Sequence, residues 1–106
     1  MTPEEEAKID VLLRSMWERH LPTLYERLDL LDRAASEAAS GTMSETLRAQ
    51  AFEVAHKLSG SLGMFGYHHG TEIARQMEQI LKTLTSDSHS DLTSLTTELR
   101  QTLLGK

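Results

Sequence analysis

His56 stands out among the residues able to do chemistry, because small residues follow it at helical spacing. On a helix, Gly60 and Gly63 lie beside it, one and two turns further along. Each glycine costs a helix about 0.8–1 kcal/mol relative to alanine, so its repeated use here needs a reason. One reason is clearance, since missing side chains would let another protein approach the imidazole closely.

The same residues are also compatible with two simpler explanations. A histidine on a polar helix face commonly stays solvated and has no further role. Gly63 and Gly66 lie near the expected end of the helix, where glycine is a common terminator. The residue types alone leave these explanations open.

The helix that carries His56 must bury its opposite face. Small and apolar residues recur at the spacing of an amphipathic helix, namely Ala51, Ala55, Leu58, Leu62 and Phe65. His56 lies about 140° from this stripe on a helical wheel. The pattern therefore predicts that the imidazole points away from the core.

The run from His56 to Gly60, followed by Gly63, Gly66 and Glu78, resembles the signature of histidine phosphotransfer (HPt) domains of bacterial two-component phosphorelays. In that family, a histidine exchanges a phosphoryl group with an aspartate of a response-regulator receiver domain. The resemblance implies that His56 is the phosphoacceptor and that Gly60 gives the receiver room. Glu78 matches a family position and is expected to be structural.

The resemblance also implies a phosphoryl environment formed by Lys57, Ser59 and Gly60. Many family members carry lysine where this chain has Ser59, so Lys57 is the remaining cation close to the histidine in sequence. Ser59 is a candidate to hydrogen-bond the imidazole or the phosphoryl group. A solvated lysine and a helix-surface serine are the alternatives.

Three further residues are expected to bind the partner. Phe52 lies at the edge between core and surface, and would suit docking of a receiver helix if it is exposed. Glu53, one turn before His56, is a candidate to orient the ring or tune its pKa. Gly63 is expected to share the clearance role of Gly60.

The resemblance implies a phosphocarrier rather than an enzyme with its own small-molecule substrate. The receiver would supply carboxylates, a lysine and Mg²⁺, so we expect no cofactor on this chain. A hybrid sensor histidine kinase is a second candidate partner. The absence of the usual lysine at Ser59 motivates an alternative: a helical bundle that docks receivers or dimerises without transferring phosphate.

A metal site is not expected. His68 and His69 are adjacent, and neighbours on a helix point about 100° apart. No cysteine or carboxylate completes a convincing ligand set with His56.

Composition limits the class of protein. The 106 residues suit a single domain, 1–106, and the net charge of −5 argues against nucleic acid or an anionic membrane as partner. Cysteine is absent, the acidic N-terminus is not a signal peptide, and no apolar stretch is long enough to span a bilayer. A cytoplasmic location is expected.

The apolar pattern predicts an all-α protein with helices from Thr2 to Leu21, Pro22 to Ser40, Ser44 to Gly63, His68 to Leu84 and Asp91 to Leu104. Proline disfavours helix in the preceding residue, so Leu21-Pro22 is expected to break the chain. Short loops favour antiparallel neighbours. We therefore predict an antiparallel up-down-up-down four-helix bundle, with an additional N-terminal helix packed over one end, as in HPt domains.

Overall fold

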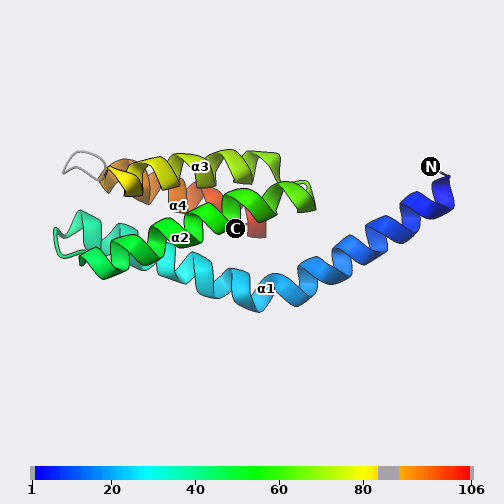
Figure 1. Cartoon of the computed structure of the whole chain (residues 1–106), viewed down its shortest axis with the longest axis horizontal. Helices are drawn as coiled ribbons and strands as arrows, with labels where there is room; N and C mark the ends of the chain where they lie inside the picture. Colours follow the sequence, from blue (N-terminus) through cyan, green and yellow to red (C-terminus); the bar gives the residue numbers. More distant parts are fainter. Residues whose placement is uncertain (1, 84–88, 106) are drawn as a thin grey trace.

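The computed structural model describes residues 2–83 and 89–105, which form four α-helices and one short 3-10 helix (Figure 1). The elements are α1 (Pro3–Ala39), α2 (Glu45–Ser61), η1 (Leu62–Phe65), α3 (His68–Lys82) and α4 (His89–Leu104). No strand occurs in this part of the chain. Residues 84–88, which include the expected end of the fourth helix and most of the loop after it, lie outside the described residues.

The helices form one bundle in which successive elements run in opposite directions (Figure 1). α2 packs against α3, α3 against α4 and α4 against α1, while α1 also contacts α2. This arrangement confirms the predicted all-α helical bundle.

Leucine and alanine dominate the core, with one isoleucine and one methionine. The stripe predicted for α2 is largely confirmed, since Ala51, Ala55, Leu58 and the following Leu62 are all 0% exposed. Small side chains on α2 let the neighbouring helices approach it closely. The other buried apolar residues are Leu24, Leu28, Leu31, Ala34, Ala35, Leu47, Ile73, Ala74, Met77, Leu81, Leu92, Leu99 and Leu103.

The helix ends have identifiable caps. Thr2 Oγ1 accepts a hydrogen bond from the Glu5 N–H at 3.2 Å, and Ser44 Oγ accepts one from the Leu47 N–H at the start of α2. Gly41 ends the first long helix with a φ of 71°, a conformation that glycine adopts without strain.

The predicted break at Leu21-Pro22 is wrong, because α1 continues through Pro22. Proline removes one backbone N–H and crowds the carbonyl four residues earlier, which bends a helix without necessarily ending it. Figure 1 shows α1 changing direction near its middle. Leu24 and Leu28, directly after the proline, are buried in the bundle.

The separate N-terminal helix packed over the bundle end is also wrong. Residues 3–21 form the first half of α1, called the arm below, and extend away from the bundle (Figure 1). The molecule consequently measures 53 × 23 × 21 Å. The arm touches the bundle end through Trp17, whose ring centroid lies 5.1 Å from that of Phe65 and 4.8 Å from that of Tyr67.

Candidate functional site

His56 lies on the outer face of α2, and 64% of its side chain is exposed. Its neighbours Ala55 and Leu58 are completely buried on the opposite face, which fixes the orientation of the helix. The imidazole therefore points to solvent, as the helical wheel predicts.

Glu78 of α3 is the hydrogen-bond partner of His56. Its Oε1 lies 2.8 Å from His56 Nδ1, and only 17% of the Glu78 side chain is exposed. Met77 and Leu81, both completely buried, hold this part of α3 in the core and so bring Glu78 to the edge of α2. The structural role expected for Glu78 therefore takes the form of a direct contact with the imidazole.

This contact determines which ring nitrogen is available. An ionised carboxylate can only accept hydrogen bonds. Nδ1 of His56 therefore carries the ring proton and donates a hydrogen bond to Glu78 Oε1. In the neutral ring, the lone pair then lies on Nε2, the nitrogen furthest from the backbone. The arrangement presents an exposed nucleophile of defined tautomer.

Phe52 stacks on the same imidazole from one turn earlier in α2. The two ring planes are nearly parallel, at 6°, with centroids 6.4 Å apart. Phe52 is half-buried and packs against the core. It therefore limits ring movement and leaves an apolar edge beside His56.

Ser59 and Lys57 lie beside His56 without contacting its ring nitrogens. Ser59 Oγ donates to the backbone oxygen of His56 at 2.7 Å, so its proton is already used within the helix. Lys57 and Glu53 instead line a shallow groove of about 390 Å³ between α1 and α2, together with Leu30. Glu53 is not the residue that orients the ring; Glu78 holds that position.

The glycines after His56 are not required by packing among the described residues. A Cβ built on Gly60 meets no described atom within 4 Å, and one on Gly63 meets only Thr71 Oγ1, at an ordinary 3.5 Å. Gly66 has a different role, because its φ of 86° forms the turn after η1. The surface beside His56 is consequently open.

His69 has a carboxylate partner on a neighbouring helix. His69 Nε2 lies 2.8 Å from Glu98 Oε1, a solvent-exposed pair between α3 and α4. In the part of the chain that the structure describes, no group of three or more potential ligands comes together.

His20 lies at the bundle end, apart from His56, and its sequence neighbours give no sign of its environment. Its Nε2 is buried without a hydrogen-bond partner, and its ring stacks on Phe65 at 6.1 Å and 16°. Burial, with a smaller contribution from the positive charge of Arg27, lowers the pKa of His20 below its usual value. This environment of His20 has no sequence signature, because it depends on packing against Phe65 in a distant segment.

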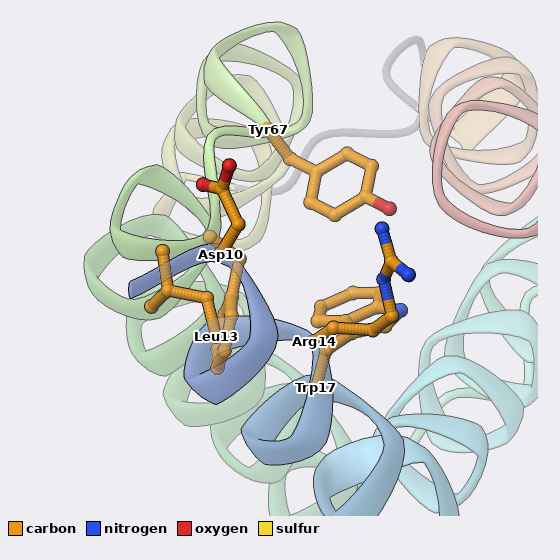
Figure 2. A pocket seen from close by; sticks show the side chains of 6 residues that line it. Asp10, Leu13, Arg14, Trp17 and Tyr67 are labelled. Carbon is orange, nitrogen blue, oxygen red and sulfur yellow. The ribbon is translucent and has the colours of Figure 1, made fainter. Parts of the chain in front are cut away.

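A pocket of about 400 Å³ lies between the arm and the start of α3. Figure 2 shows Asp10, Leu13, Arg14 and Trp17 of α1 on one side of it and Tyr67 on the other. None of the residues around His56 lines this pocket.

Comparison with known proteins identifies the family. Residues 15–104 match the family model of the Hpt domain, and the chain belongs to this family. Hpt domains are helical bundles that act as phosphocarrier modules, transferring phosphoryl groups through a histidine and interacting with response-regulator receiver domains.

One curated relative is "Protein RcaC" of Microchaete diplosiphon, which is 33% identical over 66 residues. The match covers 62% of this chain but only 10% of that protein. No solved structure matches the chain. Among the described residues, no helix is both long and apolar enough to cross a membrane.

Proposed function

We propose that this chain carries a phosphoryl group on Nε2 of His56, to or from the aspartate of a response-regulator receiver domain. The observation that carries the proposal is the exposed imidazole whose other nitrogen donates to the largely buried Glu78. The carboxylate selects the tautomer and stabilises the positive charge that develops on the ring during attack.

The transfer step requires only one bond to form and one to break. The Nε2 lone pair attacks the phosphorus of an aspartyl phosphate, the bond from phosphorus to the aspartate oxygen breaks, and its electron pair stays on the carboxylate. The reverse step returns the group to an aspartate. Alignment and charge stabilisation dominate such reactions, so a correctly held ring is the main demand on this chain.

The partner supplies the remaining chemistry in this proposal. Mg²⁺ and a lysine of the receiver stabilise the moving phosphoryl oxygens, and this chain acts on no small molecule of its own. Lys57 adds positive charge near the phosphorylated histidine. The Ser59 hydroxyl already donates its hydrogen bond to the helix backbone, so it contributes only an acceptor oxygen. A hybrid sensor histidine kinase is a second candidate partner, and the cytoplasm is the expected compartment.

The receiver docks, in this proposal, on the α2 face formed by Phe52, Gly60 and Gly63, with Glu53 at its margin. Phe52 offers apolar surface, and the open space above Gly60 allows the partner backbone to approach. Close approach matters because the receiver aspartate must align with Nε2.

The test mixes the purified chain with a phosphorylated receiver domain and Mg²⁺, and follows acid-labile phosphate on each protein. We expect label on the wild type and none on His56→Gln. His69→Gln is the matched control, since it removes another exposed histidine with a carboxylate partner, and it should be labelled like the wild type. Stoichiometric label on His56→Gln would refute the assignment.

A receiver-docking module that does not transfer phosphate is the second candidate. The serine at position 59 favours it, because it replaces the usual lysine and its proton is already donated to the helix backbone. Binding of receivers without detectable label, in conditions that label another Hpt domain, would support this alternative over the carrier.

A further inference from the structure

The arm has one face toward the bundle and one face without a partner. Leu13 and Trp17 point toward the bundle end, across the pocket of Figure 2. On another face, Ile9, Leu12 and Met16 are 41%, 55% and 37% exposed. No described part of the chain covers these three apolar side chains.

A helix in this position needs a partner for its apolar face. Most helices in proteins are stabilised by packing an amphipathic face rather than by intrinsic helix propensity. The arm meets the bundle mainly through the aromatic contacts of Trp17 and His20 near its C-terminal end. The exposed apolar residues therefore indicate an interaction surface.

Charges at the two ends of this surface indicate its partner. At helical spacing, Ile9, Leu12 and Met16 share a line with Glu5 before them and Arg19 after them. The line is acidic at one end, apolar in its middle and basic at the other end. A surface of this kind is complementary to its own copy when the two run in opposite directions.

We propose that the arms of two copies of this chain pair antiparallel, with Leu12 near the twofold axis. Glu5 of each copy then lies near Arg19 of the other, and Ile9 faces Met16. A parallel pair would instead place Glu5 beside Glu5 and Arg19 beside Arg19. The proposal does not depend on the chemistry of His56.

The charge of the arm disfavours an anionic membrane as the alternative occupant. Residues 3–21 contain five acidic side chains (Glu4, Glu5, Glu6, Asp10 and Glu18) and three basic ones (Lys8, Arg14 and Arg19). Amphipathic helices that bind anionic lipid are rich in lysine and arginine on their polar face. A second copy, in contrast, satisfies both the apolar residues and the charges at the ends.

Analytical ultracentrifugation of the whole chain over a concentration series tests the proposal. We expect a reversible dimer for the wild type, weakened at least about tenfold by Leu12→Glu because a charge would be buried in the centre of the interface. Val11→Glu is the matched control: Val11 is 67% exposed but lies about 100° from Leu12 around the helix. It should dimerise like the wild type, and circular dichroism should show that both variants are folded.

Charge reversal tests the antiparallel orientation. Glu5→Arg and Arg19→Glu should each weaken the dimer by about threefold or more, because each brings like charges together. An equimolar mixture should restore it, since both contacts then join opposite charges. A wild type that is monomeric at every concentration, equal effects of Leu12→Glu and Val11→Glu, or a mixture no tighter than the single variants would each overturn the proposal.

Discussion

At the scale of single residues, the pairing of His56 with Glu78 is the central feature. The contact places a proton on Nδ1 and leaves Nε2 free, so one carboxylate defines the orientation and tautomer of the imidazole. The Phe52 ring stacks nearly parallel to it. The imidazole is thus held in position although most of it is in solvent.

Glu78→Ala should slow phosphoryl transfer while the fold is kept. A hydrogen bond to a charged group contributes roughly 1.5–3 kcal/mol, so its loss in the transition state predicts a rate lower by about tenfold or more. Glu78→Gln retains an acceptor oxygen and should lose less. Rates measured from a phosphorylated receiver check this order, and an unchanged rate in Glu78→Ala would show that the contact is not used.

Substitution by alanine should change the stability of the fold differently at Gly60 and at Gly70. At Gly60 a Cβ meets no described atom, so Gly60→Ala should stabilise the fold by about 0.5–1 kcal/mol. At Gly70 a Cβ would lie 3.2 Å from Leu62 Cδ1 and 3.3 Å from Leu103 Cδ2. Gly70→Ala should therefore be less stable than Gly60→Ala by at least about 1 kcal/mol in urea denaturation. Equal stabilities would contradict the packing argument.

A larger side chain at Gly60 tests whether the glycine is needed for approach of the receiver rather than for folding. Gly60→Phe should remain folded, because the space beside α2 is open, but it should transfer phosphate more slowly, because the receiver cannot approach as closely. Wild-type transfer by this variant would show that the glycine is not part of the docking face.

At the scale of the elements, packing of α2 on α3 brings His56 and Glu78 together. Two arginines also connect helices of the bundle through their side chains. Arg48 of α2 donates to the Leu81 oxygen near the end of α3 at 2.8 Å. Arg100 of α4 binds Asp29 of α1 at 3.0 Å and also contacts Asp32. Both arginines tie elements that are distant in sequence.

Pro22 controls the direction of the arm. Pro22→Ala would return a backbone N–H for the Glu18 carbonyl and allow α1 to straighten, with a gain in helix stability of up to about 3 kcal/mol. Straightening should separate Trp17 from Phe65 and Tyr67. The protein has one tryptophan, so its emission should shift to longer wavelength, whereas the neighbouring exposed Thr23→Ala should leave it unchanged. Identical emission of wild type and Pro22→Ala would contradict this role.

At the scale of the whole molecule, half-buried His20, whose Nε2 is shielded from solvent, should make stability depend on pH. Burial first, and the charge of Arg27 second, lower its pKa in the folded state. The unfolded chain, with a histidine pKa of about 6.5, then binds the proton more readily. The free energy of unfolding should therefore fall as pH decreases below about 6.5, until the folded protein also binds the proton.

Urea denaturation at a series of pH values checks this expectation. His20→Leu should remove this component of the pH dependence, and Arg27→Gln should reduce it by a smaller amount, because burial is the larger cause. The same slope in wild type and His20→Leu would show that other groups determine the pH dependence.

Most of the helices and the orientation of His56 were predictable from local sequence patterns. Leu58, Leu62 and the alanines of α2 repeat with the helical period, so their burial forces the histidine to the opposite face. The local chemistry of Thr2 and Gly41 likewise predicted one helix start and one helix end. These features depend on residues close together in the chain, where spacing alone defines geometry.

The residue that holds the imidazole and the position of the arm depend instead on how the helices pack. Glu78 is 22 residues from His56, and it reaches Nδ1 because α3 packs against α2, whereas the nearby Glu53 faces the groove toward α1. α1 continues through Pro22, and the arm before it contacts the bundle through Trp17 and His20, whose rings lie against Phe65. Both outcomes depend on contacts between distant segments, which local periodicity does not contain.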